Sequence, residues 1–220
     1  MIEALRQGRS STTLELENIA VEARTSESFA RAALARFAAL AENGSFSVDS
    51  KARVELALEI ARAGQLKEAA QSLRWQEFET FGGECLLEAG FRVEKNIRVR
   101  GDGRAWQIDL VGFRGDLILA IDCKHWNTSG YESRLQPPAN HQSVATTHFM
   151  RTLRTKPTDQ GGNLLQGLAV ILTLLEPPVR FLEKCALVSV ERLPGFLNAV
   201  TPYDRSLPLL SISDLQSKTL

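Results

Sequence analysis

The stretch that decides the fold is QIDLVGFRGDLILAIDCK, residues 107–124, in which two aliphatic and β-branched runs flank Gly115-Asp116. Gly-Asp is an acceptable two-residue turn between two such runs. If Gly115-Asp116 forms the turn, Asp109 lies directly opposite Asp122, and opposed residues share a sheet face. Lys124 follows on that face because side chains alternate along a strand. The pattern therefore predicts a hairpin with two carboxylates and a lysine at its far end.

The same register separates apolar side chains from charged ones and pairs Arg114 with Leu117. One face is expected to be apolar, with a gap at Gly112, and to carry Ile108, Leu110, Leu117, Leu119, Ile121 and Cys123. The other face is expected to carry Val111, Phe113, Ile118 and Ala120 near the turn, followed by Gln107, Asp109, Asp122 and Lys124.

Two buried carboxylates side by side are unfavourable unless protons or cations neutralise them. Magnesium typically binds one or two carboxylates together with phosphate oxygens. The pair Asp109 and Asp122 therefore indicates a metal site. An Asp-x-Lys triplet taken alone more often marks a solvated strand edge or a local ion pair, so the paired register carries the argument.

A longer context, from Trp75 to Trp126, resembles a known family. A helix that opens with WQEFE at residues 75–79 is followed by a basic loop with Gly101-Asp102-Gly103, the Asp109 strand, and IDCKHW at residues 121–126. This order resembles the Mrr-like branch of the PD-(D/E)xK nuclease superfamily and, more loosely, the archaeal Holliday junction resolvases. The resemblance implies an α/β fold of the restriction-endonuclease-like type, a mixed sheet flanked by helices, preceded here by a helical N-terminal region.

The resemblance also implies roles for single residues. Asp109 matches the first metal-binding aspartate, Asp122 the (D/E) position and Lys124 the lysine of the motif. Glu79 matches the acidic residue on the first helix that often completes the site. The implied cofactor is Mg2+, with Mn2+ able to substitute, and the implied partner is DNA.

The chain departs from the Mrr-like pattern at two places. Asp122 stands where glutamine is commonest, which gives the more general carboxylate form of the motif. Residues 104–107, RAWQ, replace the usual run of glycines before the aspartate, which puts in doubt a substrate preference taken from Mrr-like enzymes. Glu77 and Glu84 are fallback ligands, since an error of one helical turn changes which carboxylate faces the sheet; otherwise they are exposed helix charges.

Basic and aromatic residues gather near the same end. Arg100 and Arg104 are predicted to hold phosphates, and Trp106 and Trp126 to stack on unpaired bases. The competing interpretation is an ordinary surface with one or two core tryptophans. The histidines at 141 and 148 lack paired metal-ligand spacing and are assigned to the surface or to packing.

Composition sets wider limits. The chain has 220 residues, 26 Lys+Arg and 26 Asp+Glu, so a nucleic-acid binder with this balance needs local basic patches. Cys85, Cys123 and Cys185 lack zinc or disulfide spacing. No apolar run is long enough for a membrane span, and we expect a soluble, cytoplasmic protein.

The predicted organisation is a helical region, residues 1–70, before a nuclease-like domain, residues 71–220. Helices are expected at 12–24, after Thr25-Ser26, and after Asp49 or Ser50 until Gly64, with a fourth running from Gln65 into the helix of Glu79. The third and fourth helices have suitable lengths for a DNA-binding helix-turn-helix, but acidic residues offset their cations. A packing or dimerisation domain is therefore favoured, and homodimer formation is an open alternative.

Beyond the hairpin, residues 127–138 are expected to form a loop and residues 141–155 a helix. Buried strands are expected at 167–175 and 185–190, a short helix near 195–200 and an edge strand within 209–215.

The sequence thus predicts a metal-dependent DNA endonuclease that hydrolyses phosphodiester bonds in restriction or DNA repair. Two alternatives stay open: a non-catalytic DNA-binding or scaffolding module with a nuclease fold and, within the enzyme class, a structure-selective junction resolvase.

Overall fold

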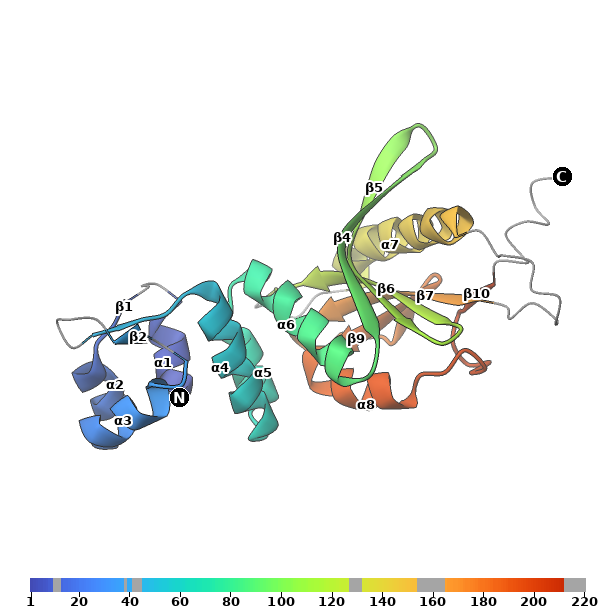
Figure 1. The fold of residues 1–220 in the computed structure, drawn as a ribbon. Coiled ribbons are helices and arrows are strands. Elements are labelled where there is room, and N and C mark those ends of the chain that lie inside the picture. Colours follow the sequence, from blue (N-terminus) through green and yellow to red (C-terminus); the bar gives the residue numbers. More distant parts are fainter. Residues whose placement is uncertain (10–12, 38, 41–44, 127–131, 154–164, 212–220) are drawn as a thin grey trace, which may run out of the picture. The chain divides into compact units, whose positions relative to one another are not determined.

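The computed structural model describes residues 1–9, 13–37, 39–40, 45–126, 132–153 and 165–211 (Figure 1). Its contacts divide the chain into two compact units, Met1–Phe81 and Gly82–Leu220. The division falls inside helix α6, Trp75–Glu88, and therefore later than the predicted boundary at residue 70.

The sequence pattern predicts a purely helical N-terminal region. In the structure, three short strands of this unit form an antiparallel sheet of order β1-β3-β2. A strand at the start of the first predicted helix shortens it to α2. The elements before α6 are α1 (Ile2–Gln7), β1 (Thr13–Leu14), α2 (Leu16–Glu22), α3 (Glu27–Leu34), β2 (Ala39–Leu40), β3 (Phe46–Ser47), α4 (Ser50–Arg62) and α5 (Leu66–Gln71).

The predicted caps are confirmed. Ser26 accepts the Phe29 N–H at the start of α3, and Asp49 accepts the Ala52 N–H at the start of α4. The predicted helix pair is present, because α4 and α5 are joined by residues 63–65, which include Gly64; α2 and α3 are likewise joined by a short turn, residues 23–26. The predicted continuous fourth helix is wrong, because α5 ends at Gln71 and α6 begins at Trp75.

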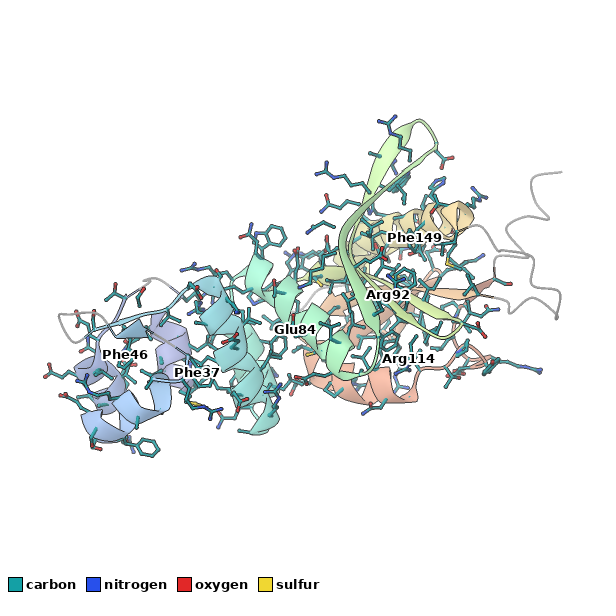
Figure 2. All side chains as sticks on the ribbon, viewed as in Figure 1. Phe37, Phe46, Glu84, Arg92, Arg114 and Phe149 are labelled. Carbon is teal, nitrogen blue, oxygen red and sulfur yellow. The ribbon has the colours of Figure 1, made fainter. Side chains whose placement is uncertain are left out.

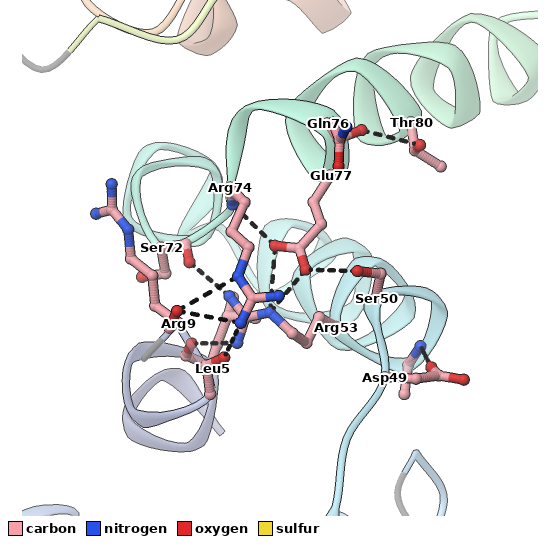
Figure 3. Close-up of polar contacts among 12 residues, drawn as sticks. Leu5, Arg9, Asp49, Ser50, Arg53, Ser72, Arg74, Gln76, Glu77 and Thr80 are labelled. Carbon is pink, nitrogen blue, oxygen red and sulfur yellow. Dashed lines mark hydrogen bonds and ion pairs between the residues drawn. The ribbon is translucent and has the colours of Figure 1, made fainter. Parts of the chain in front are cut away.

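A buried arginine explains that break (Figure 3). Arg53 of α4 is 1% exposed, and its Nε lies 3.0 Å from Glu77 Oε1. Its two terminal nitrogens donate to the carbonyl oxygens of Leu5 and Ser72, each at 2.7 Å. Because Glu77 also accepts the Arg74 N–H, at 2.8 Å, the chain turns between α5 and α6 around one guanidinium.

The second unit contains a seven-stranded mixed sheet of order β4-β5-β6-β7-β9-β8, with β10 paired to β7. Strands β4 to β6 are antiparallel, and β6, β7 and β9 are parallel. The strands are β4 (Arg92–Gly101), β5 (Arg104–Arg114), β6 (Leu117–Lys124), β7 (Gln166–Thr173), β8 (Phe181–Leu182), β9 (Cys185–Ser189) and β10 (Leu210–Ser211). The predicted class, an α/β fold with a mixed sheet flanked by helices, is confirmed at this level.

Helices cover both faces of this sheet. A Cβ on Gly82 of α6 would lie 3.1 Å from Leu172 and 3.4 Å from Leu110, so the Gly82-Gly83 pair lets the helix approach one face closely. Helix α7 (Glu132–Thr152) covers the other face, where Ala145, Phe149 and Met150 join one buried cluster with Ile118 and Ala120. The remaining helix of the described part, α8 (Leu193–Ala199), follows a single 3-10 turn, Val190–Arg192.

Helix α7 begins earlier than the sequence indicates. Residues 132–138 are helical despite Pro137 and Pro138, although we expect a loop there, and residues 127–131 lie outside the described part. Leu135 and Ala139 explain the difference, because both are buried against β7, β8 and β9 and this packing offsets the missing backbone donors. None of the described helices is both long and apolar enough to cross a membrane.

Candidate metal and nucleic-acid site

The β5–β6 hairpin has the predicted register, from Arg114 opposite Leu117 to Leu110 opposite Ile121. Gly115 has φ +57, the left-handed value that the first residue of a tight hairpin turn requires. Beyond Leu110 the backbone ladder stops. Asp109 Oδ2 instead accepts the N–H of Cys123 at 2.9 Å, so the carboxylate takes the place of a backbone acceptor and is fixed beside β6.

Asp109 carries an unfavourable charge. Burial raises the pKa of its carboxyl above the ordinary 3.8, and the negative charge of Asp122 raises it further. The Cys123 N–H, the Lys124 ammonium and a hydrogen bond from Gln107 lower the pKa but do not cancel the burial effect. Mutual repulsion of two partly buried carboxylates is the condition that a bound cation relieves.

Asp122 and Lys124 form a close ion pair on β6. Lys124 Nζ lies 2.9 Å from Oδ1 and 2.7 Å from Oδ2 of Asp122. The Asp122 side chain is 12% exposed and that of Lys124 is 26% exposed. Asp122 alternates with Ile118 and Ala120, so it lies on the face that α7 covers, as predicted.

Asp109 lies where the side-chain alternation of β5 reverses. Trp106 stacks against His141 and His148, at centroid distances of 4.9 and 5.7 Å, while Phe113 meets Phe149 at 6.2 Å. All three partners are on α7, although positions 106 and 113 point to opposite faces in a regular strand. Two predicted places are therefore wrong. Ile108 joins the α7-side cluster, although it was predicted to share the other face with Leu110. Gln107 is exposed on the side opposite to that cluster, although it was predicted to share the face of Phe113 and Asp122.

The β4 strand supplies a cause for this reversal. Asn96 has φ +56 and interrupts the ladder between the pairs Lys95–Leu110 and Ile97–Ile108. A residue in the left-handed region twists the ribbon locally. No simple count of alternating residues can predict such a twist.

His141 of α7 packs against Trp106, in agreement with its predicted place at the surface or in packing. Burial lowers the pKa of His141; Arg104 and Lys124 act in the same direction, while Asp122 and Asp109 oppose them. His141 therefore lies within electrostatic reach of the charged cluster. Gln142 is fully buried, and neither its amide oxygen nor its nitrogen has a hydrogen-bond partner in the described structure. Both lie inside the helix that the sequence predicts at residues 141–155, and Gln142 belongs to no sequence motif that would single it out.

Glu79 lies half-buried on α6, in the N-terminal unit, whereas Asp109, Asp122 and Lys124 belong to the second unit. The structure thus brings together three of the four predicted catalytic residues within one unit. The two fallback ligands, Glu77 and Glu84, form ion pairs with other residues. Glu77 is 2% exposed and holds Arg53, so it is not an exposed helix charge, and Glu84 Oε1 lies 3.8 Å from Lys95 Nζ.

The predicted nucleic-acid residues divide into two groups. Arg100 and Arg104 are exposed, but they lie on strands β4 and β5 rather than on a loop. Trp106 is 3% exposed, donates its indole N–H to Gly101 O at 3.0 Å and carries the Arg104 guanidinium 3.5 Å above its ring. Its ring is part of the core, which argues against base stacking at this position. Trp126 is half-buried, with Arg134 at 4.3 Å from its ring.

The described residues contain no cluster of three or more His, Cys, Asp or Glu side chains arranged to hold a metal ion. Two carboxylates of one unit, Asp109 and Asp122, are therefore the donors on which a metal site here would rest. This number suits a magnesium ion that fills its remaining positions with water and phosphate oxygens.

Comparisons with known proteins define no family. No family model matches the chain, and no curated protein matches it. Among solved structures it is similar to protein VC1899 from Vibrio cholerae, with 13% identity and a TM-score of 0.42 over 90% of this chain and 47% of that one. It is also similar to AF1548, a protein of unknown function, with 18% identity and a TM-score of 0.32 over 64% of this chain and 65% of that one. The chain thus spans about half the length of the Vibrio cholerae protein.

Proposed function

We propose that this protein is a metal-dependent DNA endonuclease of the PD-(D/E)xK type. Asp109, Asp122 and Lys124 form its proposed active site, at which phosphodiester bonds of DNA are hydrolysed. The observation that carries the proposal is the pairing of two partly buried carboxylates, in which burial and then the charge of Asp122 raise the pKa of Asp109, with a lysine 2.7 Å from Asp122. Such a cluster is unfavourable for folding alone, and perturbed groups of this kind gather at functional sites.

The donor set fits Mg2+ or Mn2+. Asp109 and Asp122 would hold the ion, and the ion would supply charge neutralisation at the phosphate and a more acidic water. Cys123 N–H orients the Asp109 carboxylate, so one of the two donors is fixed before any ion binds.

Lys124 has a separate role in this proposal. Its ammonium donates hydrogen bonds and cannot accept them, so it can hold the attacking water and a phosphate oxygen in place. Asp122 positions that ammonium through their close ion pair. His141 is a further candidate for handling a proton, because its ring lies on α7 within electrostatic reach of Asp109, Asp122 and Lys124.

The test is cleavage of plasmid and single-stranded DNA with Mg2+ or Mn2+, against the same reactions with chelator. We expect Asp122→Asn and Lys124→Ala to abolish cleavage and to leave the fold intact. Asp116→Asn, at the turn of the same hairpin, is the matched control and should cleave normally. Full activity in Asp122→Asn, with contaminating nuclease excluded, would overturn the site assignment. A wild-type protein that binds DNA but cleaves no substrate in a panel including junctions and flaps would favour the non-catalytic binding module.

A further inference from the structure

Strands β4 and β5 form a two-faced ribbon beyond Asn96. Its inner face consists of Ile97, Val99, Trp106 and Ile108, which pack in the α7-side cluster. Its outer face consists of the register pairs Arg98–Gln107 and Arg100–Ala105, and all four residues are exposed. We call these four residues the outer ribbon face. It carries two cations and no carboxylate. Figure 2 shows side chains on both sides of the β4–β5 ribbon.

The ribbon is anchored to α7 at its tip. Asp102 Oδ2 lies 3.0 Å from His148 Nε2, and Gly101 lies so close to His148 that a Cβ there would be 2.1 Å from the ring. Asp102 and Gly103 have φ +51 and +76, the two positive values of a tight hairpin turn. The only acidic residue at the tip is therefore directed to α7, and the outer ribbon face stays basic.

The outer ribbon face is linked to the carboxylate pair through Gln107. Gln107, opposite Arg98, hydrogen-bonds Asp109, the position at which the side-chain alternation of β5 reverses. Arg98 and Arg100 are two residues apart, so their backbones are separated by about 6.8 Å along the strand. Two cations at this spacing can contact successive phosphates of a strand whose scissile phosphate lies at Asp109.

We propose that the outer ribbon face binds the backbone of double-stranded DNA and that duplex DNA, rather than a single strand, is the substrate delivered to Asp109 and Asp122. The proposal rests on the proposed function for its second half. A two-stranded β-ribbon is narrow enough to enter the major groove of a duplex.

The aromatic residues of the ribbon favour a duplex over a single strand. Proteins that bind single strands without sequence preference stack bases on exposed aromatic rings. No described residue of β4 or β5 presents an exposed ring, since Trp106 is buried and Phe113 is half-buried beneath Arg92, 4.1 Å from its ring. The ribbon therefore presents cations to a phosphate backbone but no exposed aromatic ring on which a base can stack.

The experiment measures DNA affinity of the full chain by fluorescence anisotropy without divalent cations, so that binding is separated from cleavage. Each phosphate contact contributes about 0.9 to the slope of log affinity against log salt on duplex DNA. We expect Arg98→Gln/Arg100→Gln to reduce that slope by about 1.8. Between about 50 and 200 mM salt the wild type should then lose about 12-fold more affinity than the variant.

Matched variants distinguish this surface from net charge. Arg180→Gln/Arg205→Gln removes the same charge from exposed arginines of the same unit and should leave the slope unchanged. Arg98→Lys/Arg100→Lys keeps both cations and should keep the slope. An unchanged slope in Arg98→Gln/Arg100→Gln, or an equal reduction in the control pair, would overturn the assignment of the surface.

The choice of duplex is tested with a single strand of equal length and the same dye. Duplex should bind more tightly, and a single strand that binds equally or more tightly would refute the choice. The two proposals can fail separately. Cleavage with an unchanged slope removes the ribbon assignment alone, whereas a reduced slope without cleavage on any substrate removes the nuclease assignment alone.

Discussion

Replacing Arg53 of α4 by methionine should strongly destabilise the N-terminal unit. The guanidinium is 1% exposed and makes three kinds of contact: with Glu77 at 3.0 and 3.2 Å, with Leu5 O and with Ser72 O. Methionine fills similar space but leaves Glu77, 2% exposed, without its cation. Breaking one side of a buried ion pair typically costs about 3–5 kcal/mol, and we expect a loss of this size.

The assay is urea unfolding of the full chain followed by circular dichroism, with hydrogen exchange to assign the lost protection to residues 1–81. Lys51→Met is the matched control, because the Lys51–Glu55 pair on the same helix is exposed and 3.8 Å apart. The double variant Arg53→Met/Glu77→Leu removes both charges and should be more stable than Arg53→Met alone. A loss below about 1 kcal/mol in Arg53→Met, the range of exposed pairs, would refute the reasoning.

Three further predictions concern the second unit. Folding raises the pKa of Asp109, so the free energy of unfolding decreases as the pH rises from 3.8 through the raised pKa. Asp109→Asn, which can still accept the Cys123 N–H, should therefore be more stable than wild type at neutral pH and lose this advantage in acid; thermal melts without metal that show no pH dependence of the difference would contradict this. Asp122→Asn should bind duplex DNA with the wild-type salt slope while losing cleavage, which anisotropy and plasmid assays measure side by side. Gly101→Val should detach the ribbon tip from His148, because even a Cβ there lies 2.1 Å from the ring, and a lower melting temperature with weaker duplex binding is expected.

The hairpin was predictable because its turn and its pattern agree. Gly115 can take a positive φ without strain, and the flanking aliphatic runs fix which residues share a face near the turn. The register from Arg114 to Leu110 followed from these two facts. The paired carboxylates were predictable for the same reason, since they lie only one step beyond the ladder.

The missed features have long-range causes. The reversal of faces before Phe113 depends on Asn96, whose positive φ no local pattern announces. The contact between Arg53 and Glu77 joins two helices that are distant in sequence. The ribbon is a different case. Asp102-Gly103 is a strong hairpin signal between two strand-like runs, and strands β4 and β5 extend to this turn, where the resemblance indicates a basic loop.

The hydrogen bond from Cys123 N–H to Asp109 has a practical consequence for spectroscopy. This amide donates to a carboxylate rather than to a backbone carbonyl, so its proton resonance depends on the charge of Asp109. In a 15N–1H correlation spectrum, the Cys123 signal should shift when Asp109 is protonated or when a divalent cation draws charge from it. The backbone of β6 thus contains a nuclear magnetic resonance reporter for the carboxylate, which allows a titration of the site in the absence of DNA and of turnover.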